Sequence, residues 1–321
     1  MHPPHPGRNT SDDWFRASEA AGDFMGIRYG HIHTRANEPE WHVLSHCECD
    51  GIGGFARLLR AQGVALDPLP ATQYPCPGVI GPLWRRWRDR ARQPHLAIRP
   101  DWLPQPPTTQ QTTENPAWHL FTKEETHQII ARCRDAKITV NSHLLHALDH
   151  TVRPEIRDPS LAIAWLIPVN LRGNLPCMED DTRNHVSCVE VPIAAGDTPQ
   201  AIQRRIRRHL DRGEHRANQL LLEIGRILKH HTKVKMIRKS RTKPAGNIGS
   251  FSNLGVWNAI HTPTTDDGWV FCPPVVSGQL LTAGCVTYNG RLGLATQGIP
   301  AAASSSERMT QWVRNICHTS H

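Results

Sequence analysis

The residues best suited to chemistry lie in one short run, Ser45-His46-Cys47-Glu48-Cys49-Asp50-Gly51. An imidazole can take a proton from a hydroxyl or amine near neutral pH, which is the task of a general base in acyl transfer. An aspartate four residues after the histidine, closed by a glycine that lets the backbone bend, completes a spacing typical of acyl-transfer sites. We therefore take His46 as the candidate base, with Asp50 and Gly51 as its companions.

The flanking sequence predicts the elements that position this run. The apolar residues 41–44 indicate a short strand, and the glycine-rich residues 51–54 open an apolar helix that continues through Leu59. His46 is then expected at the end of a strand, where a rigid element can present a catalytic group.

Three downstream segments support this interpretation of the run, because they follow it in a particular order. They are Ile167-Pro168-Val169-Asn170-Leu171-Arg172, Phe251-Ser252-Asn253-Leu254-Gly255 and Thr287-Tyr288-Asn289-Gly290-Arg291-Leu292. Together the four segments resemble the CoA-dependent acyltransferase superfamily with the chloramphenicol-acetyltransferase-like fold. The similar branches are alcohol O-acetyltransferases, wax ester synthase/diacylglycerol acyltransferases, polyketide-associated acyltransferases and peptide-synthetase condensation domains.

The resemblance covers residues 41 to about 296 and implies an α/β (α+β) fold of mixed sheets with flanking helices. Family members usually carry a substantial half-domain before the histidine motif, whereas here only a short polar leader precedes it. We therefore expect an N-terminally shortened member, with a misassigned start or one part of a split enzyme as alternatives. The predicted organisation is a remnant of the N-terminal half over 1–67, a Pro-rich excursion or lid over 68–115, and a C-terminal acyltransferase half over 116–321.

For the histidine motif, the resemblance implies two roles. His46 would deprotonate the acceptor, which then attacks a thioester directly, without an acyl-enzyme. Asp50 would form a structural ion pair that keeps the His46 side chain oriented, and Arg172 is the expected partner. Arg172 could instead be a solvated charge at a strand end.

For the downstream segments, the resemblance implies a tunnel near the histidine. A tetrahedral oxyanion needs a positioned donor, and Ser252 or Asn253 is expected to supply it. The alternative for this segment is a purely structural role, as a turn that closes a strand. Asn170 and Gly255 are expected to line the tunnel that takes substrate and CoA.

A metal site is not expected. Cys47, Glu48 and Cys49 beside His46 offer ligand types that zinc prefers. However, we identify no Cys-x-x-Cys or spaced histidine pair elsewhere that completes a tetrahedral set, and we expect the remaining histidines at the surface. We also expect no permanently bound cofactor, with acyl-CoA as a cosubstrate.

Elsewhere the sequence predicts a mixture of helices and strands. A capping box at Thr122-Lys123-Glu124-Glu125 starts one helix, and Asn289-Gly290 suits the turn of a hairpin. Helices are predicted over 12–25, 122–133, 141–152, 198–212 and 217–230, and strands over 161–169, 186–191 and the two arms of 279–297.

The composition and charge of the chain indicate where the protein is located and which partners it binds. None of the apolar runs reaches the roughly 20 residues that span a bilayer, and nine cysteines, an odd number, indicate reduced thiols, so a cytoplasmic protein is expected. The net charge of +8 favours anionic partners such as CoA phosphates, an acidic acyl-carrier protein or a membrane surface. The basic runs 204–208 and 229–243 would provide the contact, with a solvated face as the alternative. No nucleic-acid-binding module is recognisable.

These observations predict an acyltransferase that moves an acyl group from acyl-CoA to a small-molecule or lipid alcohol. Ester formation is favoured over amide formation because the strings at 252–255 and 289–292 look more like the alcohol-acylating branches. A condensation-type enzyme with a carrier-bound donor and a non-catalytic or split partner subunit remain as alternatives.

Overall fold

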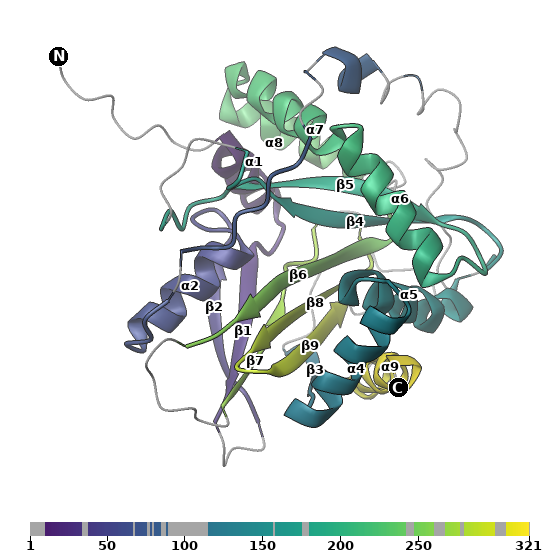
Figure 1. Cartoon of the computed structure of the whole chain (residues 1–321). Helices are drawn as coiled ribbons and strands as arrows, with labels where there is room; N and C mark the ends of the chain where they lie inside the picture. Colours follow the sequence, from purple (N-terminus) through teal and green to yellow (C-terminus); the bar gives the residue numbers. More distant parts are fainter. Residues whose placement is uncertain are drawn as a thin grey trace.

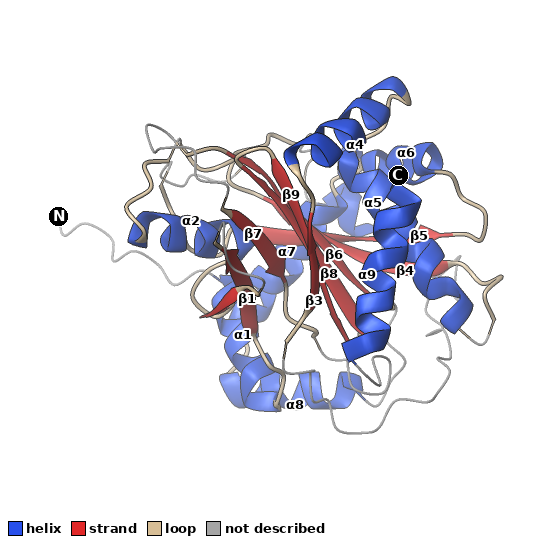
Figure 2. Cartoon of the chain, turned by 90° about the horizontal axis from the view of Figure 1, so that it is seen from below, coloured by secondary structure: helices blue, strands red, loops and turns tan. Residues whose placement is uncertain are grey.

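The computed structural model describes residues 10–33, 38–66, 68–75, 78, 80–84, 88, 115–156, 158–174, 180–241, 247–259, 267–276, 279–298 and 306–320. Two sheets and the helices around them make up this part of the chain (Figures 1 and 2). The principal elements are α1 (Thr10–Ala21), β1 (Gly26–Ile32), β2 (Glu40–Ser45), α2 (Gly51–Ala61), β3 (Ala117–Leu120), α4 (Lys123–Asp135), α5 (Val140–Val152), β4 (Ile163–Asn170), β5 (Val186–Ile193), α6 (Pro199–Asp211), α7 (Glu214–Ile224), α8 (His230–Arg241), β6 (Gly249–Trp257), β7 (Gly268–Cys272), β8 (Leu281–Tyr288), β9 (Arg291–Gly298) and α9 (Ser306–Ser320).

The larger sheet has six strands in the order β3-β9-β8-β6-β4-β5. It is mixed, because β6 runs parallel to both β4 and β8 while the other neighbours are antiparallel. Helices α4, α5 and α9 pack with it around the main core, and Figure 2 shows α5 and α9 side by side over the sheet. The predicted mixed α/β fold class is thus confirmed.

The smaller sheet has three strands in the order β2-β1-β7, all antiparallel. Helix α2 covers it, and a second core forms between them around Tyr29, Phe55 and Phe271. Because β7 comes from the C-terminal part of the chain, this sheet joins the segment before residue 67 to the segment after residue 116. The active-site candidates lie where these two segments meet.

Most predicted elements are present. Helix α4 begins with the capping box, in which the Thr122 side chain and the Glu125 carboxylate accept each other's backbone N–H groups. Asn289 and Gly290 have φ values of 47° and 80°, as the tight β8–β9 turn requires. Strand β5 continues through Pro192 to Ile193, which is tolerated because β5 is an edge strand and a missing N–H there can face outward.

The differences lie mainly at element ends and in segments without a clear pattern. Helix α1 ends at Ala21 rather than near Met25, because Gly22 takes a positive φ of 105°. The helix predicted over 217–230 is instead α7, which ends at Ile224. Of the predicted excursion 68–115, residues 89–114 lie outside the described residues. Among the described helices, none is long and apolar enough to cross a membrane.

Candidate active site

His46 occupies the turn between β2 and α2. Strand β2 ends at Ser45, and the chain turns through residues 46–48 before Asp50 caps α2 by accepting the Gly53 N–H at 2.7 Å. A cap of this kind satisfies one of the free donors at the start of a helix. His46 therefore lies between two anchored ends, as the sequence predicts.

Two oxygen atoms face one nitrogen of the His46 ring and so define its tautomer. Nδ1 lies 3.1 Å from the Cys49 carbonyl oxygen and 3.0 Å from the Asn184 Oδ1. The Asn184 amide is itself oriented, because its Nδ2 donates to Asp12 Oδ1 at 2.7 Å and to the His46 carbonyl at 2.9 Å. Since both neighbours of Nδ1 are acceptors, Nδ1 carries the proton and Nε2 is left with a free lone pair.

The ring is also held by packing and kept neutral by burial. Phe15 of α1 stacks on His46 with ring centroids 4.1 Å apart. Burial lowers the pKa of His46 below its usual value of 6.5, and this outweighs the opposing attraction of Asp50 and the hydrogen bonds to Cys49 and Asn184. A neutral imidazole with a free Nε2 is the form that can accept a proton near neutral pH.

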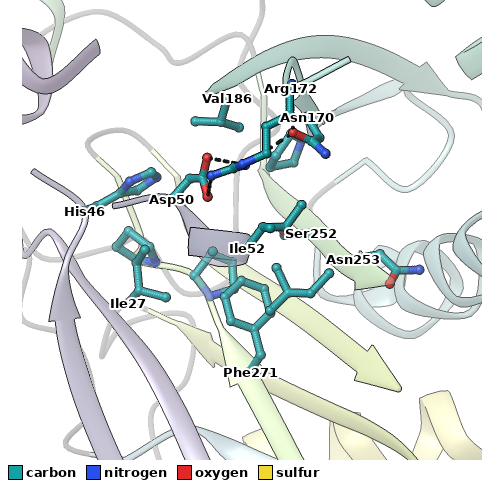
Figure 3. A pocket seen from close by; sticks show the side chains of 15 residues that line it. Ile27, His46, Asp50, Ile52, Asn170, Arg172, Val186, Ser252, Asn253 and Phe271 are labelled. Carbon is teal, nitrogen blue, oxygen red and sulfur yellow. Dashed lines mark hydrogen bonds and ion pairs between the residues drawn. The ribbon is translucent and has the colours of Figure 1, made fainter. Parts of the chain in front are cut away.

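The structure brings Asp50 and Arg172 together in a buried, two-pronged ion pair (Figure 3). Arg172 donates from Nη1 to Asp50 Oδ2 at 2.9 Å and from Nη2 to Asp50 Oδ1 at 3.0 Å, with both side chains at most 5% exposed. Asp50 also accepts the His185 N–H at 2.8 Å. The Asp50 carboxylate therefore accepts four hydrogen bonds, which join the turn after β2 to α2, to Arg172 and to the segment before β5.

Two adjoining cavities lie beside His46. The nearer, of about 70 Å³, contains all the predicted site residues except Gly255 in its wall. The farther, of about 290 Å³, has Gly255 in its wall together with Tyr74 and Asn141. Because Asn170 and Asn253 line both, the two cavities are neighbours, and only the nearer one has His46 in its wall.

The two oxyanion candidates are placed differently. Ser252 is buried in β6, and Figure 3 shows it between the His46 side of the cavity and Asn253. Asn253 is exposed, and its Oδ1 accepts the Gly255 N–H at 2.8 Å. Gly255 has a φ of 84° at a bulge between β6 and β8, a conformation that favours glycine. The segment is therefore a strand with a bulge, and of the two side chains Ser252 lies nearer the His46 side of the cavity.

Asn170 connects the cavity wall to the start of the predicted excursion. Its Nδ2 donates to the Pro70 carbonyl, and its Oδ1 accepts the backbone N–H of Arg172. Four residues later, Asn174 exchanges two hydrogen bonds with the backbone of Tyr74. Residues 70–74 are thus held along the farther cavity.

The predicted Gly51 lies in the wall of the nearer cavity, where an added Cβ would come within 2.7 Å of the Leu254 side chain. Gly53, two residues on, is more restricted, because a Cβ there would lie 2.0 Å from the Thr182 carbonyl oxygen. Close backbone approach between α2 and residue 182 therefore requires glycine at position 53.

Sequence reasoning missed Asn184, together with Asp12 and Phe15, which hold His46 from two remote segments. Asn184 is fully buried and lies two residues before β5. Its only signal is the polar pair Asn184-His185 ahead of an apolar strand, and nothing in that spacing points to residue 46.

The remaining candidates of the motif are buried thiols. Burial raises the pKa of Cys49 to about 12 and raises that of Cys47 as well. Cys49 donates to the Ser45 carbonyl, and Cys47 to Glu19. Protonated, packed thiols of this kind are poor metal ligands.

The basic runs are partly used inside the protein. Lys233 is 2% exposed, pairs with Asp13 at 3.6 Å and lies over the Trp14 ring. Arg205 pairs with Asp197. The exposed cations of α6 are Arg204, Arg207 and Arg208.

Comparison with solved structures places this architecture among known folds. The chain superposes on TRI3 trichothecene 15-O-acetyltransferase from Fusarium sporotrichioides with a TM-score of 0.57 and 10% identity, covering 99% of this chain and 76% of that one. For polyketide synthase associated protein 5 from Mycobacterium tuberculosis the TM-score is 0.54 and the identity 19%, covering 89% and 75%. For the EpoB cyclization-docking bidomain of a nonribosomal peptide synthetase from Sorangium cellulosum the values are 0.54 and 13%, covering 91% and 63%.

No protein-family model matches the chain, and no curated protein matches it in sequence. The structural likeness nevertheless shows the fold, which this chain shares with TRI3, polyketide synthase associated protein 5 and the EpoB bidomain. The fold predicted from the four sequence segments is thereby confirmed.

Proposed function

We propose that the protein is an acyltransferase in which His46 is the general base, moving an acyl group from acyl-CoA to an alcohol. The observation that carries the proposal is the fixed His46 tautomer. Its Nδ1–H is bound by the Cys49 carbonyl and Asn184, so only Nε2 can take a proton, and the ring lies in the wall of the cavity that contains Ser252.

The proposed reaction is a direct transfer. The acceptor hydroxyl gives its proton to His46 Nε2 as its oxygen attacks the thioester carbonyl carbon. The carbonyl oxygen becomes an oxyanion, which the Ser252 hydroxyl stabilises by donating a hydrogen bond. When the tetrahedral intermediate collapses, the C–S bond breaks and the imidazolium returns its proton to the departing thiolate. Asp50 and Arg172 hold the turn throughout and exchange no proton.

The donor and the acceptor are proposed from two sequence strings and from proteins that share the fold. An alcohol acceptor is favoured by the strings at 252–255 and 289–292, and TRI3, which has the same fold, is by name an O-acetyltransferase. The EpoB bidomain, also of this fold, belongs to a nonribosomal peptide synthetase, so a carrier-bound donor is the second candidate. The exposed arginines of α6 suit the phosphates of either donor.

The test is thiol release from acetyl-, medium-chain and long-chain acyl-CoA in the presence of a panel of alcohols. The wild type is compared with His46→Ala and with the matched control His127→Ala, which removes an exposed imidazole on α4. General-base catalysis is worth about 10² to 10⁴ in rate, so His46→Ala should lose acceptor-dependent turnover by at least about a hundredfold while His127→Ala keeps it.

Turnover by His46→Ala at the wild-type rate would refute the role of the base. Absence of turnover with every acyl-CoA, followed by turnover with a carrier-bound acyl group, would move the protein to the condensation type. Turnover only after addition of a second polypeptide would identify a split partner.

A further inference from the structure

A second group of chemically capable side chains lies on the smaller sheet, well outside the cavities beside His46. His31 belongs to β1, His33 follows that strand directly, and Asp267 directly precedes β7. One ligand atom from each lies within 4.8 Å of the other two, the one such trio of metal-ligating side chains among the described residues. His31-x-His33 is a spaced histidine pair, which the sequence-based expectation of no metal site does not take into account.

Strand geometry explains why these residues meet. Side chains two residues apart in a strand point to the same face, so His31 and His33 share a face of the sheet. In the β1–β7 ladder His31 lies opposite Trp269, and Asp267 is two residues before it. In the β1–β2 ladder His31 lies opposite Glu40. Three strands thus bring two imidazoles and two carboxylates to one end of one face.

We propose that this His31–His33–Asp267 cluster binds a divalent zinc ion. Zinc bonds of about 2.0–2.2 Å to nitrogen and oxygen, at the tetrahedral angle, separate neighbouring ligand atoms by about 3.4 Å. His31 Nε2 lies 3.5 Å from Asp267 Oδ2, and His33 Nε2 lies 3.4 Å from Glu40 Oε2. Both pairs already have the spacing of two ligands on one ion, and the exposed Glu40 carboxylate can supply the fourth ligand by rotating.

The surroundings of His31 suit a metal ligand. Its side chain is buried and stacks on Trp269 with ring centroids 4.4 Å apart and an angle of 3° between planes, which fixes the ring. The Gln62 amide nitrogen, Nε2, lies 3.1 Å from His31 Nδ1. Because the two ends of an amide can exchange by rotation, Gln62 can accept the Nδ1–H and leave Nε2 free for the ion, as the outer partner of a metal-bound histidine does.

The position of the cluster assigns the ion a structural role. Ser45, just before His46, pairs with Gly26 at one end of the β1–β2 ladder, while Glu40 pairs with His31 at the other. The ion would therefore fasten β7 to β1 at the end of the sheet remote from the cavity. Binding should stabilise the fold without placing the metal on the reaction path.

The experiment adds zinc chloride to metal-stripped full-length protein and measures bound zinc by equilibrium dialysis with elemental analysis, together with the thermal unfolding midpoint. The expected result is one zinc ion per chain and a higher midpoint. His33→Gln and Asp267→Asn, both at exposed or half-buried positions, should each weaken binding by about tenfold or more. His230→Gln, which removes an exposed imidazole of α8, is the matched control and should keep the affinity.

The control is needed because the chain contains 20 histidines and nine cysteines that could take up zinc elsewhere. Circular dichroism establishes that the variants are folded. Cobalt substitution adds a separate readout, because its visible absorption bands should disappear in Asp267→Asn. Zinc binding of equal strength in wild type, His33→Gln and Asp267→Asn would overturn the proposal, as would no binding by the wild type at micromolar zinc.

Discussion

The Asp50–Arg172 pair provides the sharpest test of how the histidine turn is held. The perturbation is a double-mutant cycle composed of Asp50→Ala, Arg172→Met and the double variant. Asp50→Ala removes both charge-assisted hydrogen bonds to Arg172 and leaves the guanidinium buried among neutral acceptors, which include the Asp181 and Arg183 carbonyls and the Asn170 Oδ1. It also removes the acceptor for the N–H groups of Gly53 and His185.

These contacts set the expected magnitudes. Breaking a buried ion pair by removing one partner costs about 3 to 5 kcal/mol of the free energy of unfolding. Asp50→Ala should fall in or above this range, because an N-cap worth about 1 kcal/mol is lost with it. Arg172→Met should cost less, since the Asp50 carboxylate keeps two N–H donors. The double variant should be more stable than the sum of the singles predicts, with a coupling energy of about 2 kcal/mol or more.

The assay is equilibrium urea unfolding followed by tryptophan fluorescence and by far-UV circular dichroism, whose transitions must coincide for the energies to be compared. Glu48 and Arg57 form a control pair in the same turn and helix, with N···O 3.9 Å and both side chains exposed. The coupling energy of this control pair should be less than about 1 kcal/mol and should decrease with added salt. The coupling energy of Asp50 and Arg172 should not change with salt. Additive effects of Asp50→Ala and Arg172→Met would refute the reasoning.

Two further predictions concern histidines whose pKa the fold lowers. In Asn184→Ala the His46 ring loses one of the two acceptors that orient Nδ1–H, so kcat/KM for thiol release should fall about tenfold or more. Because that hydrogen bond raises the pKa of His46, its loss should also move the acid limb of the pH profile of kcat/KM to lower pH. An acid limb at the wild-type pH would contradict the assignment. Burial lowers the pKa of His215 to about 4 from 6.5, so the unfolded state binds the extra proton below pH 6.5 and stability is lost as the pH falls. Between pH 7 and about pH 5 the wild type should lose about 2 kcal/mol more than His215→Gln in urea unfolding, and equal losses would show that His215 is not buried in its neutral form.

Local patterns predicted the elements around the site because each pattern reports an interaction between near neighbours. The capping box of α4 joins residues three apart, the Asn289-Gly290 turn needs two positive φ values, and the apolar run over 161–169 becomes the buried strand β4. The elements that the sequence does not predict are those whose stability comes from remote partners. Strand β7 has five buried residues and no alternation to reveal it, and it is a strand because β1 lies beside it.

The same distinction separates the predicted from the missed residues of the site. Asp50 and Arg172 could be paired from sequence because the resemblance links their two segments and because a buried carboxylate requires a cation. Asn184 must also be placed accurately, because its Oδ1 has to face His46 Nδ1. However, a neutral amide carries no charge that requires a particular partner, so its pairing cannot be predicted from the sequence. Its role depends on Asp12 fixing the amide, on the turn placing Nδ1 opposite it, and on Phe15 fixing the ring plane. The tautomer of the proposed base is thus a property of the folded chain, formed where α1, the turn after β2 and the segment before β5 meet.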